Sequence, residues 1–312
     1  MRNVGKIPKK INLPCPVSYD EPMSLHTSFR IGGSADMYIA PQSLEQAAQV
    51  YGLLNNQEIP AFILGAGANI LVSDLGIRAA VIDVSRLRGC TLSRTDRGAT
   101  LEALAGTAMS DVSTLALEQG LSGLEFIYSM PGSVGGSVWM NARGYGRSVS
   151  EVLLGVRYVE PTGVVATMGV EHDQFGYKRS PFQDWGCLIL SATFALEPGD
   201  TAVMRQQMES IKEDRERKGH FRYPCAGSIF KNNREFGNPT GKLIDALGLK
   251  GRCIGGACVS ALHGNIIVNT GSATAQDVLQ LIRRLESEVR GAYGFRLDRE
   301  ILLVGQWREE AT

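Results

Sequence analysis

Apolar and polar positions alternate along the chain in patterns that predict both helices and strands. Helical spacing of apolar residues and helix-end signals predict helices over 43–55, 110–119, 200–218 and 239–247, and a long amphipathic one from Thr274 to beyond Val289. Short apolar runs predict strands, which we place at 61–64, 80–84, 99–106, 187–196, 265–269 and 300–305. Residues 152–168 predict a hairpin that turns at Pro161-Thr162-Gly163.

Several helix ends carry residues that satisfy free backbone groups. Ser43 with Gln46 three positions later predicts a capping box at the first helix. Asp200 and Thr274 are predicted N-caps, and Gly120 stands where a helix ends on a left-handed residue. These signals support the helix boundaries given above.

The order of the elements suggests how the chain is divided. We expect lobes over 1–84 and 85–199, a third domain over 200–300, and a terminal strand and tail over 301–312. The third domain combines a strand, an amphipathic helix and a strand, which is typical of an α+β layer. Residues 1–22 are punctuated by four prolines and are predicted to be an irregular lead-in.

A glycine-rich stretch from Leu121 to Gly146 is the most informative part of the chain. At its centre, Pro131-Gly132-Ser133-Val134-Gly135-Gly136 could turn successive N–H groups toward one anion, and apolar neighbours predict that the loop is buried. A set of tight turns in a β-rich domain is the alternative. A second loop, Gly65-Ala66-Gly67-Ala68-Asn69, follows the strand predicted at 61–64 without the spacing of a Rossmann fingerprint. Two such loops suit a diphosphate held from two sides.

Composition excludes some classes of partner. The 312 residues include 32 basic and 32 acidic side chains, so we expect no general attraction to nucleic acid or membrane. No apolar run reaches the length of a membrane span, and the first residues lack the apolar core of a secretory signal. Six cysteines and four histidines form no metal-ligand spacing, so we expect no metal site and free thiols in a reducing cytoplasm.

Five segments resemble the MurB family of UDP-N-acetylenolpyruvoylglucosamine reductases, and the resemblance extends from about His26 to Gly305. They read LGAGANILVSD, GLEFIYSMPGSVGGSVWMNARGYG, GYKRSPF, PCAGSIFKN and GLKGRCIGGACVSALHGNIIVN. The resemblance implies an α+β chain with a two-lobed FAD-binding domain similar to p-cresol methylhydroxylase and vanillyl-alcohol oxidase. It also implies a C-terminal substrate-binding domain and a monomer. The implied reaction, in peptidoglycan precursor synthesis, uses NADPH to reduce UDP-N-acetylglucosamine enolpyruvate.

The resemblance also assigns roles to residues. Ser228 matches the serine that donates a proton, and Glu300 matches a second catalytic residue that could bind the substrate carboxylate. From the residues alone, Ser228 could simply satisfy a turn after Gly227, and Glu300 could be a solvated acid beside Arg299. Lys178 is assigned to the catalytic set, and the residues assigned to substrate are Tyr177, Arg179, Lys231 and Asn232. The residues assigned to the cofactor are Arg30, Leu64, Gly65, Ala66, Gly67, Ala68, Asn69, Ile70, Pro131, Gly132, Ser133, Gly135, Gly136 and Asn141.

The chain departs from the family pattern at Lys178, where the family usually has an arginine. Lysine offers a point charge instead of a planar fork, so either Lys178 or the following Arg179 could supply the positive charge. Arg30 could equally belong to a strand that ends in a glycine turn. His263 is expected to be a packed structural residue. A flavin protein with lost or altered activity and an FAD-dependent oxidase of the same fold remain alternatives.

Overall fold

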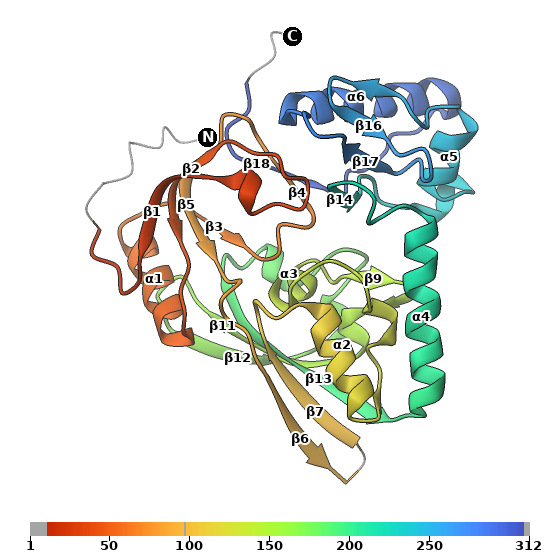
Figure 1. Ribbon diagram of the computed structural model, residues 1–312. Coiled ribbons are helices and arrows are strands. Elements are labelled where there is room, and N and C mark those ends of the chain that lie inside the picture. Colours follow the sequence, from red (N-terminus) through yellow and green to blue (C-terminus); the bar gives the residue numbers. More distant parts are fainter. Residues whose placement is uncertain (1–10, 97, 309–312) are drawn as a thin grey trace. The chain divides into compact units, whose positions relative to one another are not determined.

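The chain forms two units that are interleaved along the sequence. The computed structural model describes residues 11–96 and 98–308 (Figure 1). Of these, unit 1 contains 11–19, 37–66 and 79–213, and unit 2 contains 20–36, 67–78 and 214–308. The predicted α+β character is confirmed. The predicted boundaries at 84, 199 and 300 follow the linear sequence and stay a prediction.

The largest sheet of unit 1 is antiparallel and has the order β12-β11-β13-β7-β6, with β8 paired to the end of β13. Its central strand β13 is long and almost entirely buried, in agreement with the strand predicted at 187–196. The turn after β11 closes with a bond from Gly163 N to Glu160 O, as the predicted hairpin requires. The strands are β6 (Cys90–Thr95), β7 (Gly98–Leu104), β8 (Leu121–Ser122), β11 (Leu153–Val159), β12 (Val165–Gly169) and β13 (Leu188–Pro198).

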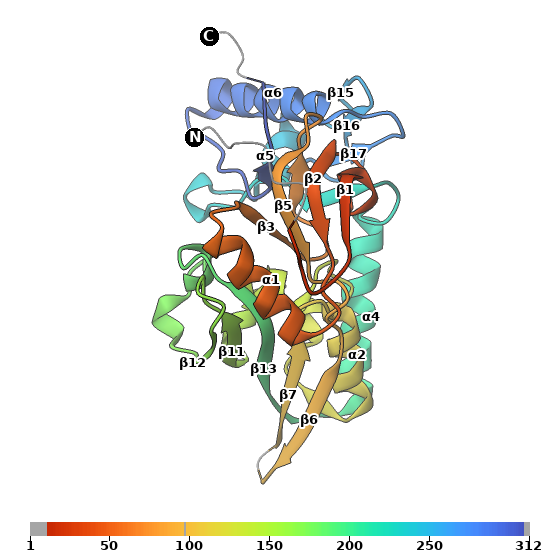
Figure 2. The same ribbon diagram turned by 90° about the vertical axis from the view of Figure 1, so that its left-hand side faces the viewer.

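Three helices of unit 1 bury one side each in the same apolar core. They are α1 (Leu44–Asn56), α2 (Met109–Glu118) and α3 (Val134–Trp139). Ser43 caps α1 by accepting a hydrogen bond from Gln46 N at 3.2 Å. The predicted capping box is not reciprocal. The side-chain oxygen of Gln46 accepts a hydrogen bond from Gln42 N and not from Ser43 N. Figure 2 shows α1 beside β3 (Ala61–Leu64), which it contacts within unit 1.

A four-stranded sheet has the order β1-β2-β5-β3. The unit boundaries fall within β1 (Val17–Pro22), β2 (Ser34–Ile39) and β5 (Ile77–Asp83). The expectation of an irregular lead-in is therefore wrong for Val17–Pro22, while residues 1–10 lie outside the described residues. Because β1 is an edge strand, the proline that ends it removes no hydrogen bond from the ladder.

Unit 2 is built on a sheet of order β14-β17-β16-β15, and α6 (Ala275–Tyr293) packs on two of its strands (Figure 1). The predicted stripe on α6 is buried. Its start carries the Thr274–Asp277 capping box, and the Asp74 carboxylate accepts two further bonds from Ala275 N and Gln276 N. The other elements are β4 (Ile70–Val72), β14 (Cys225–Ser228), α5 (Thr240–Ala246), β15 (Cys253–Ile254), β16 (Ala257–Val259), β17 (Ile266–Asn269) and β18 (Leu302–Val304).

Two connections complete the chain. The helix α4 (Thr201–Arg217) begins at Asp200, whose carboxylate accepts from Ala202 N as predicted, and the unit boundary falls near its end. Strands β4 and β18 pair in parallel within unit 2.

Short 3-10 helices link other elements, at η1 (Met23–Leu25), η2 (Glu125–Ile127), η3 (Val149–Glu151), η4 (His172–Gln174), η5 (Pro181–Gln183) and η6 (Arg234–Phe236). Within 11–96 and 98–308, every helix is too short or too polar to cross a membrane.

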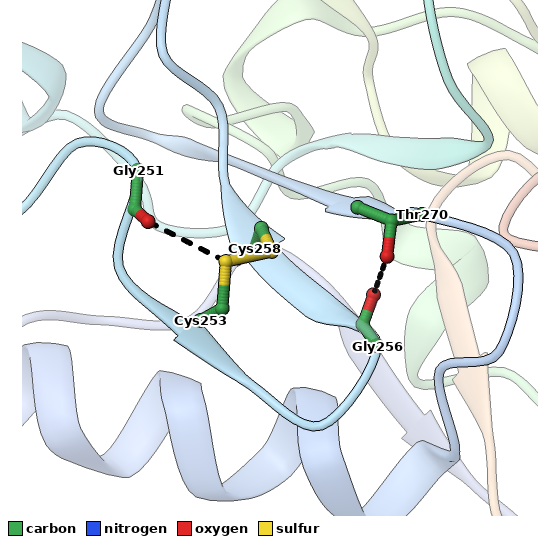
Figure 3. The surroundings of a disulfide bond; sticks show 5 residues. All are labelled: Gly251, Cys253, Gly256, Cys258 and Thr270. Atoms are coloured by element: carbon green, nitrogen blue, oxygen red, sulfur yellow. Dashed lines mark hydrogen bonds between the residues drawn. A yellow bond between two sulfur atoms is a disulfide. The ribbon is translucent and has the colours of Figure 1, made fainter.

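The structure corrects one expectation about cysteines. Cys253 and Cys258 form a disulfide across the β15–β16 hairpin (Figure 3), although all six thiols were expected to be free. The two residues are directly opposed in the strand register, with their Cα atoms 4.1 Å apart. Their five-residue separation contains the turn, so only hairpin formation brings them together. Cys15, Cys90, Cys187 and Cys225 are free.

We predict that reduction of this disulfide loosens unit 2 without unfolding it. The closed loop is short, so its removal should lower the free energy of unfolding by about 2 kcal/mol or less. Thermal unfolding with and without dithiothreitol measures the change. A Cys253→Ser/Cys258→Ser variant should match the reduced protein and no longer respond to dithiothreitol. A response that persists in this variant would mean that another thiol is responsible.

Candidate functional site

The two glycine loops meet within unit 1. A Cβ atom placed on Gly65 would lie 2.5 Å from the Ser133 Oγ atom, so only glycine allows this approach. Ser133 is buried, and its hydroxyl accepts a hydrogen bond from Gly136 N at the start of α3. The loops predicted from separate parts of the sequence therefore lie side by side at this point.

The predicted anion nest in the second loop needs correction. The N–H groups of Val134 and Gly135 donate to Thr107 O and Ala105 O, both at 2.9 Å. These groups, like Gly136 N, are already satisfied by the protein because the segment forms the helix α3. The alternative of tight turns alone does not describe the segment either.

A smaller set of N–H groups faces no acceptor in the protein. Among the described residues, the backbone N–H groups of Gly65, Ala66, Gly132 and Ser133 make no hydrogen bond to another protein group. Ser133 is buried, Gly65 and Gly132 are half-buried and Ala66 is exposed, so these donors are available to a ligand or to water. They come from both loops near the Gly65–Ser133 approach, which fits a diphosphate group.

The other residues assigned to a cofactor are divided between the units. Leu64 is buried at the end of β3 in unit 1, where Pro131 is exposed before α3. In unit 2, Gly67 O accepts from both the N–H and the hydroxyl of Ser28, and Ile70 begins β4. Ala68 lies between them and is half-buried.

The segment around Arg30 forms turns and not the strand that we considered as an alternative. Residues 26–33 connect η1 to β2 by way of bonds such as Arg30 N to Thr27 O. Arg30 has a positive φ of 55° and an exposed side chain. The bonds from Ser28 to Gly67 attach this segment to the first glycine loop within unit 2.

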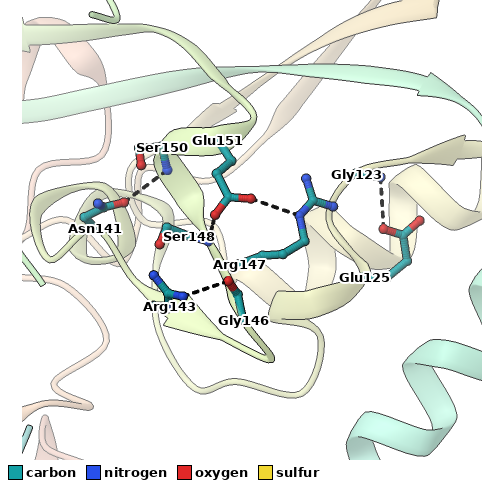
Figure 4. Close-up of polar contacts among 9 residues, drawn as sticks. All are labelled: Gly123, Glu125, Asn141, Arg143, Gly146, Arg147, Ser148, Ser150 and Glu151. Carbon is teal, nitrogen blue, oxygen red and sulfur yellow. Dashed lines mark hydrogen bonds and ion pairs between the residues drawn. The ribbon is translucent and has the colours of Figure 1, made fainter. Parts of the chain in front are cut away.

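Asn141 connects the second glycine stretch to the Tyr177-Lys178-Arg179 segment. Its buried side chain accepts from Ser150 N at 3.1 Å (Figure 4). The same side chain donates to Gly176 O at 2.8 Å. Figure 4 also shows the Ser148–Glu151 capping box beside the short pair β9 (Arg143–Gly144) and β10 (Arg147–Ser148). As built, the Asn141 amide positions a loop, and both its polar atoms have protein partners.

The segment itself is a tight turn closed by two bonds between Gly176 and Arg179. Lys178 takes a left-handed backbone conformation with φ of 58°, and its carbonyl accepts from the Gln183 side chain. Tyr177 is 45% exposed. Arg179 pairs with Asp184 at 3.2 Å and lines a pocket of about 370 Å³ next to Trp185. The two cations therefore have different surroundings although they are adjacent.

Ser228 and Glu300 come together within unit 2. The carbonyl of Ile229, which follows Ser228, accepts from Glu300 N at 2.8 Å. The Asn69 side chain donates to Glu300 O at 3.0 Å, so the first glycine loop also contacts this segment. Ser228 and Glu300 are both half-buried.

A bulge sets the direction of Ser228. From Cys225 to Ser228 the strand β14 advances by three positions, whereas β17 advances by only two, from Val268 to Ile266. Gly227 adopts a left-handed backbone conformation at the bulge, with φ of 75°. No atom lies within 4 Å of a Cβ placed on it. Bulges re-aim side chains at strand ends, and here the bulge turns Ser228 out of the regular alternation of β14.

Lys231 and Asn232 continue the same segment. Lys231 N donates to Asp298 O at 2.8 Å, and its carbonyl accepts from the Thr240 hydroxyl at 2.8 Å. Asn232 accepts from Thr240 N at the start of α5. These contacts fix the backbone of the segment. They involve only backbone atoms of Lys231, whose side chain is half-buried.

The sequence reasoning missed Asn265 as a positioning residue. Its amide is buried, accepts from Phe230 N at 2.9 Å and donates to Phe230 O at 2.8 Å, while its backbone carbonyl accepts from Ile229 N. An asparagine at the first position of a predicted strand gives no signal of this clamp, because its partner lies 35 residues away.

A pair of half-buried histidines lies next to Asn265. The rings of His220 and His263 are 6.1 Å apart, and His263 Nδ1 accepts from Asn265 N. Burial, reinforced by the nearby Arg215 and His263, lowers the pKa of His220 to about 3. Burial likewise lowers the pKa of His263. His263 therefore has the packed structural surroundings expected for it.

Comparisons with known proteins match both units. Residues 35–169 match the family model of an FAD binding domain, and residues 219–304 match that of the UDP-N-acetylenolpyruvoylglucosamine reductase C-terminal domain. FAD is therefore the cofactor of this chain, and both glycine loops lie within the residues that match its binding domain.

Whole-chain relatives carry one name. The chain is 38% identical over 293 residues to UDP-N-acetylenolpyruvoylglucosamine reductase 2 of Bacillus cereus, with 94% of each chain covered. It is 38% identical over 287 residues to the reductase of Caldanaerobacter subterraneus, covering 92% and 93%. The crystal structure of MurB from Thermus caldophilus is similar with a TM-score of 0.76 and 30% identity, covering 94% of this chain and all of that one.

We predict that Gly65→Ala weakens FAD binding. The new methyl group must displace the Ser133 hydroxyl, and loss of a helix cap alone costs about 1 kcal/mol. Since the same approach forms the FAD cradle, we expect the Kd for FAD to rise about tenfold or more. Flavin fluorescence quenching during titration of the apoprotein measures it. Gly169→Ala, at an open position in the same unit, is the matched control and should bind FAD normally.

We also predict that the half-buried His220 and His263 make unit 2 sensitive to acid. Unfolded histidine binds a proton below about pH 6.5, whereas His220 in the folded chain does so only near pH 3. The free energy of unfolding should therefore fall as the pH drops from about 6.5 toward 3, and be unaffected by these groups above pH 7. Urea unfolding at pH 7 and pH 5 should show a smaller loss for His220→Gln than for the native chain. His172→Gln, at an exposed histidine, should leave the loss unchanged.

Proposed function

The chain belongs to the UDP-N-acetylenolpyruvoylglucosamine reductase (MurB) family, and we propose that it reduces UDP-N-acetylglucosamine enolpyruvate to UDP-N-acetylmuramate with NADPH. The juxtaposition of Ser228 and Glu300 through Ile229 is the observation that carries this proposal. The reaction supplies a peptidoglycan precursor, and we expect a monomer that acts in the cytoplasm. Bound FAD supplies the chemistry of hydride transfer between NADPH and the substrate.

Ser228 supplies the proton in this scheme. Its hydroxyl donates to the carbon of the enol ether next to the one that receives hydride. A serine hydroxyl is a weak acid, so the step requires a strongly basic carbon and a short transfer distance. The bulge at Gly227 and the clamp by Asn265 support such placement, because they hold the backbone on both sides of Ser228.

Glu300 and the cations act on the substrate carboxylate. Glu300, in its protonated form, donates a hydrogen bond to the carboxylate and helps it accept the charge that develops during reduction. Lys178 supplies positive charge in the place of the family's arginine. Arg179, which pairs with Asp184 on an exposed surface, contributes to substrate binding.

The remaining polar residues bind the nucleotide sugar. The exposed Tyr177 contributes a hydrogen bond to the substrate in this scheme. Lys231 offers a point charge to the diphosphate, and Asn232 contributes from the same fixed segment.

We predict that Ser228→Ala separates the two half-reactions. Reduction of the flavin by NADPH should proceed as in the native chain, whereas reoxidation by the enolpyruvyl nucleotide should slow about 100-fold or more, the usual contribution of a general acid. Stopped-flow absorbance of the flavin follows both phases. Ser287→Ala, at an exposed serine of α6, is the control. Rapid reoxidation in Ser228→Ala would remove Ser228 from the mechanism.

The same purified protein can be used to distinguish the proposed reaction from the two alternative functions. A flavin protein with lost activity would bleach with NADPH and stay bleached when the enolpyruvyl nucleotide is added. An oxidase of this fold would consume oxygen with an alcohol or a sugar. The departure at Lys178 is the feature that favours the first alternative, and recovery of flavin absorbance by the nucleotide would dismiss both.

A further inference from the structure

A forked ion pair joins α6 to the segment that carries Glu300. The Arg299 guanidinium donates from Nε to Glu286 Oε1 at 2.6 Å and from Nη2 to Glu286 Oε2 at 2.7 Å. The two side chains are only 31% and 25% exposed. Two parallel N–H···O bonds fix the direction of both groups as well as their distance. Arg299 is therefore anchored on the helix, one residue before Glu300.

A second ion pair on the same helix has a different character. Arg284 Nη2 lies 2.6 Å from Glu288 Oε1, but these side chains are 65% and 38% exposed and both belong to α6. A solvated pair of this kind contributes little and connects the helix to no other segment. The Arg299–Glu286 pair instead crosses from the helix to an extended segment 13 residues later.

The helix is a firm support for this anchor. The buried stripe of α6 belongs to the apolar core of unit 2, and the helix contacts β15 and β16 of the same unit. Glu286 directly follows Leu285, a buried member of the stripe, and is itself half-buried. The Glu286 carboxylate is thus held in place relative to the sheet that carries Ser228.

Arg299 and Glu300 also pair with the segment that follows Ser228. Arg299 forms a β-bridge with Phe230, and Glu300 N donates to Ile229 O at 2.8 Å. Successive side chains of an extended segment point to opposite sides. Because the Arg299 side chain reaches α6, the Glu300 side chain is directed away from that helix.

We infer that Glu286 is a positioning residue for the reaction and acts through Arg299 on Glu300, an inference that rests on the proposed function of Glu300. The ion pair fixes the residue before Glu300, and the bond to Ile229 O fixes the Glu300 backbone itself. These constraints limit the orientations in which the Glu300 carboxyl group meets the substrate carboxylate. Such preorganisation speeds only the step in which the positioned group contacts the substrate.

Glu286→Gln tests this role, because it removes the negative charge and one acceptor of the fork while keeping the shape of the side chain. We expect reoxidation of the reduced flavin by the enolpyruvyl nucleotide to slow about tenfold, and reduction by NADPH to stay within about twofold of the native rate. Arg299→Lys, which keeps the charge without the fork, should slow reoxidation in the same way. Stopped-flow absorbance, normalised to bound flavin, measures both phases. Glu288→Gln, at the solvated pair of the same helix, is the matched control and should leave both unchanged.

A double-mutant cycle distinguishes positioning from support of the fold. If Glu286 acts through Glu300, adding Glu286→Gln to Glu300→Ala should slow reoxidation by less than about twofold further, because the group to be positioned is already absent. A further loss of about tenfold in the double variant, or equal losses in both half-reactions of Glu286→Gln, would overturn the inference. A native rate of reoxidation in Glu300→Ala would overturn it as well.

The same measurements separate this inference from the proposed function. If the native chain is reduced by NADPH but is not reoxidised by the enolpyruvyl nucleotide, the proposed function fails and the inference fails with it. If the native chain is reoxidised rapidly and Glu286→Gln matches it, the inference alone fails. Each variant is assayed below its own melting temperature, so that loss of the fold is not mistaken for loss of positioning.

Discussion

The backbone pairing of residues 229–231 with residues 298–300 is the constraint on which the candidate site depends. It joins segments that are about 70 residues apart in sequence, through the bonds from Glu300 N to Ile229 O and from Lys231 N to Asp298 O. Asn265 holds the first segment from β17 with both atoms of its amide. Since an unpaired buried amide costs about 1–3 kcal/mol, this arrangement resists movement in either direction. Ser228, Glu300 and Lys231 lie on or next to these paired segments.

The partners of the backbone N–H groups also explain why the two loops are rich in glycine. A glycine-rich segment suggests many N–H groups free for an anion, but most of those after Ser133 serve the start of α3 and its contacts with Ala105 and Thr107. The groups left for FAD come from the first residues of each loop. The close approach of Gly65 to Ser133 accounts for the glycine at that position, because any side chain there would displace the Ser133 hydroxyl. The glycines are thus needed for proximity as much as for flexibility.

Local patterns predicted the regular elements well. The α6 stripe from Val278 to Val289 is buried, and the predicted caps at Ser43, Asp200 and Thr274 are present, because these features depend on neighbours within one helical turn. Predictions failed where the partner is distant or where a rule has an exception. The strand β1 can end in proline because it is an edge strand. The Gln46 side chain accepts from Gln42 N, whereas the predicted capping box required Ser43 N as the donor.

For the candidate site, the sequence by itself determined the family, the cofactor class and the set of polar residues, because motifs such as the two glycine loops and the Ser228 segment are contiguous in the chain. Only the tertiary structure decided how those residues meet. It brings Gly65 to Ser133, Ser228 to Glu300, and Asn265 to Phe230, and it closes the Cys253–Cys258 disulfide. Three of these four contacts join residues more than 30 positions apart, and the fourth needs a hairpin register. The physical reason is that a local sequence pattern specifies backbone conformation over a few residues, whereas side-chain partners at long range are set by the packing of whole elements.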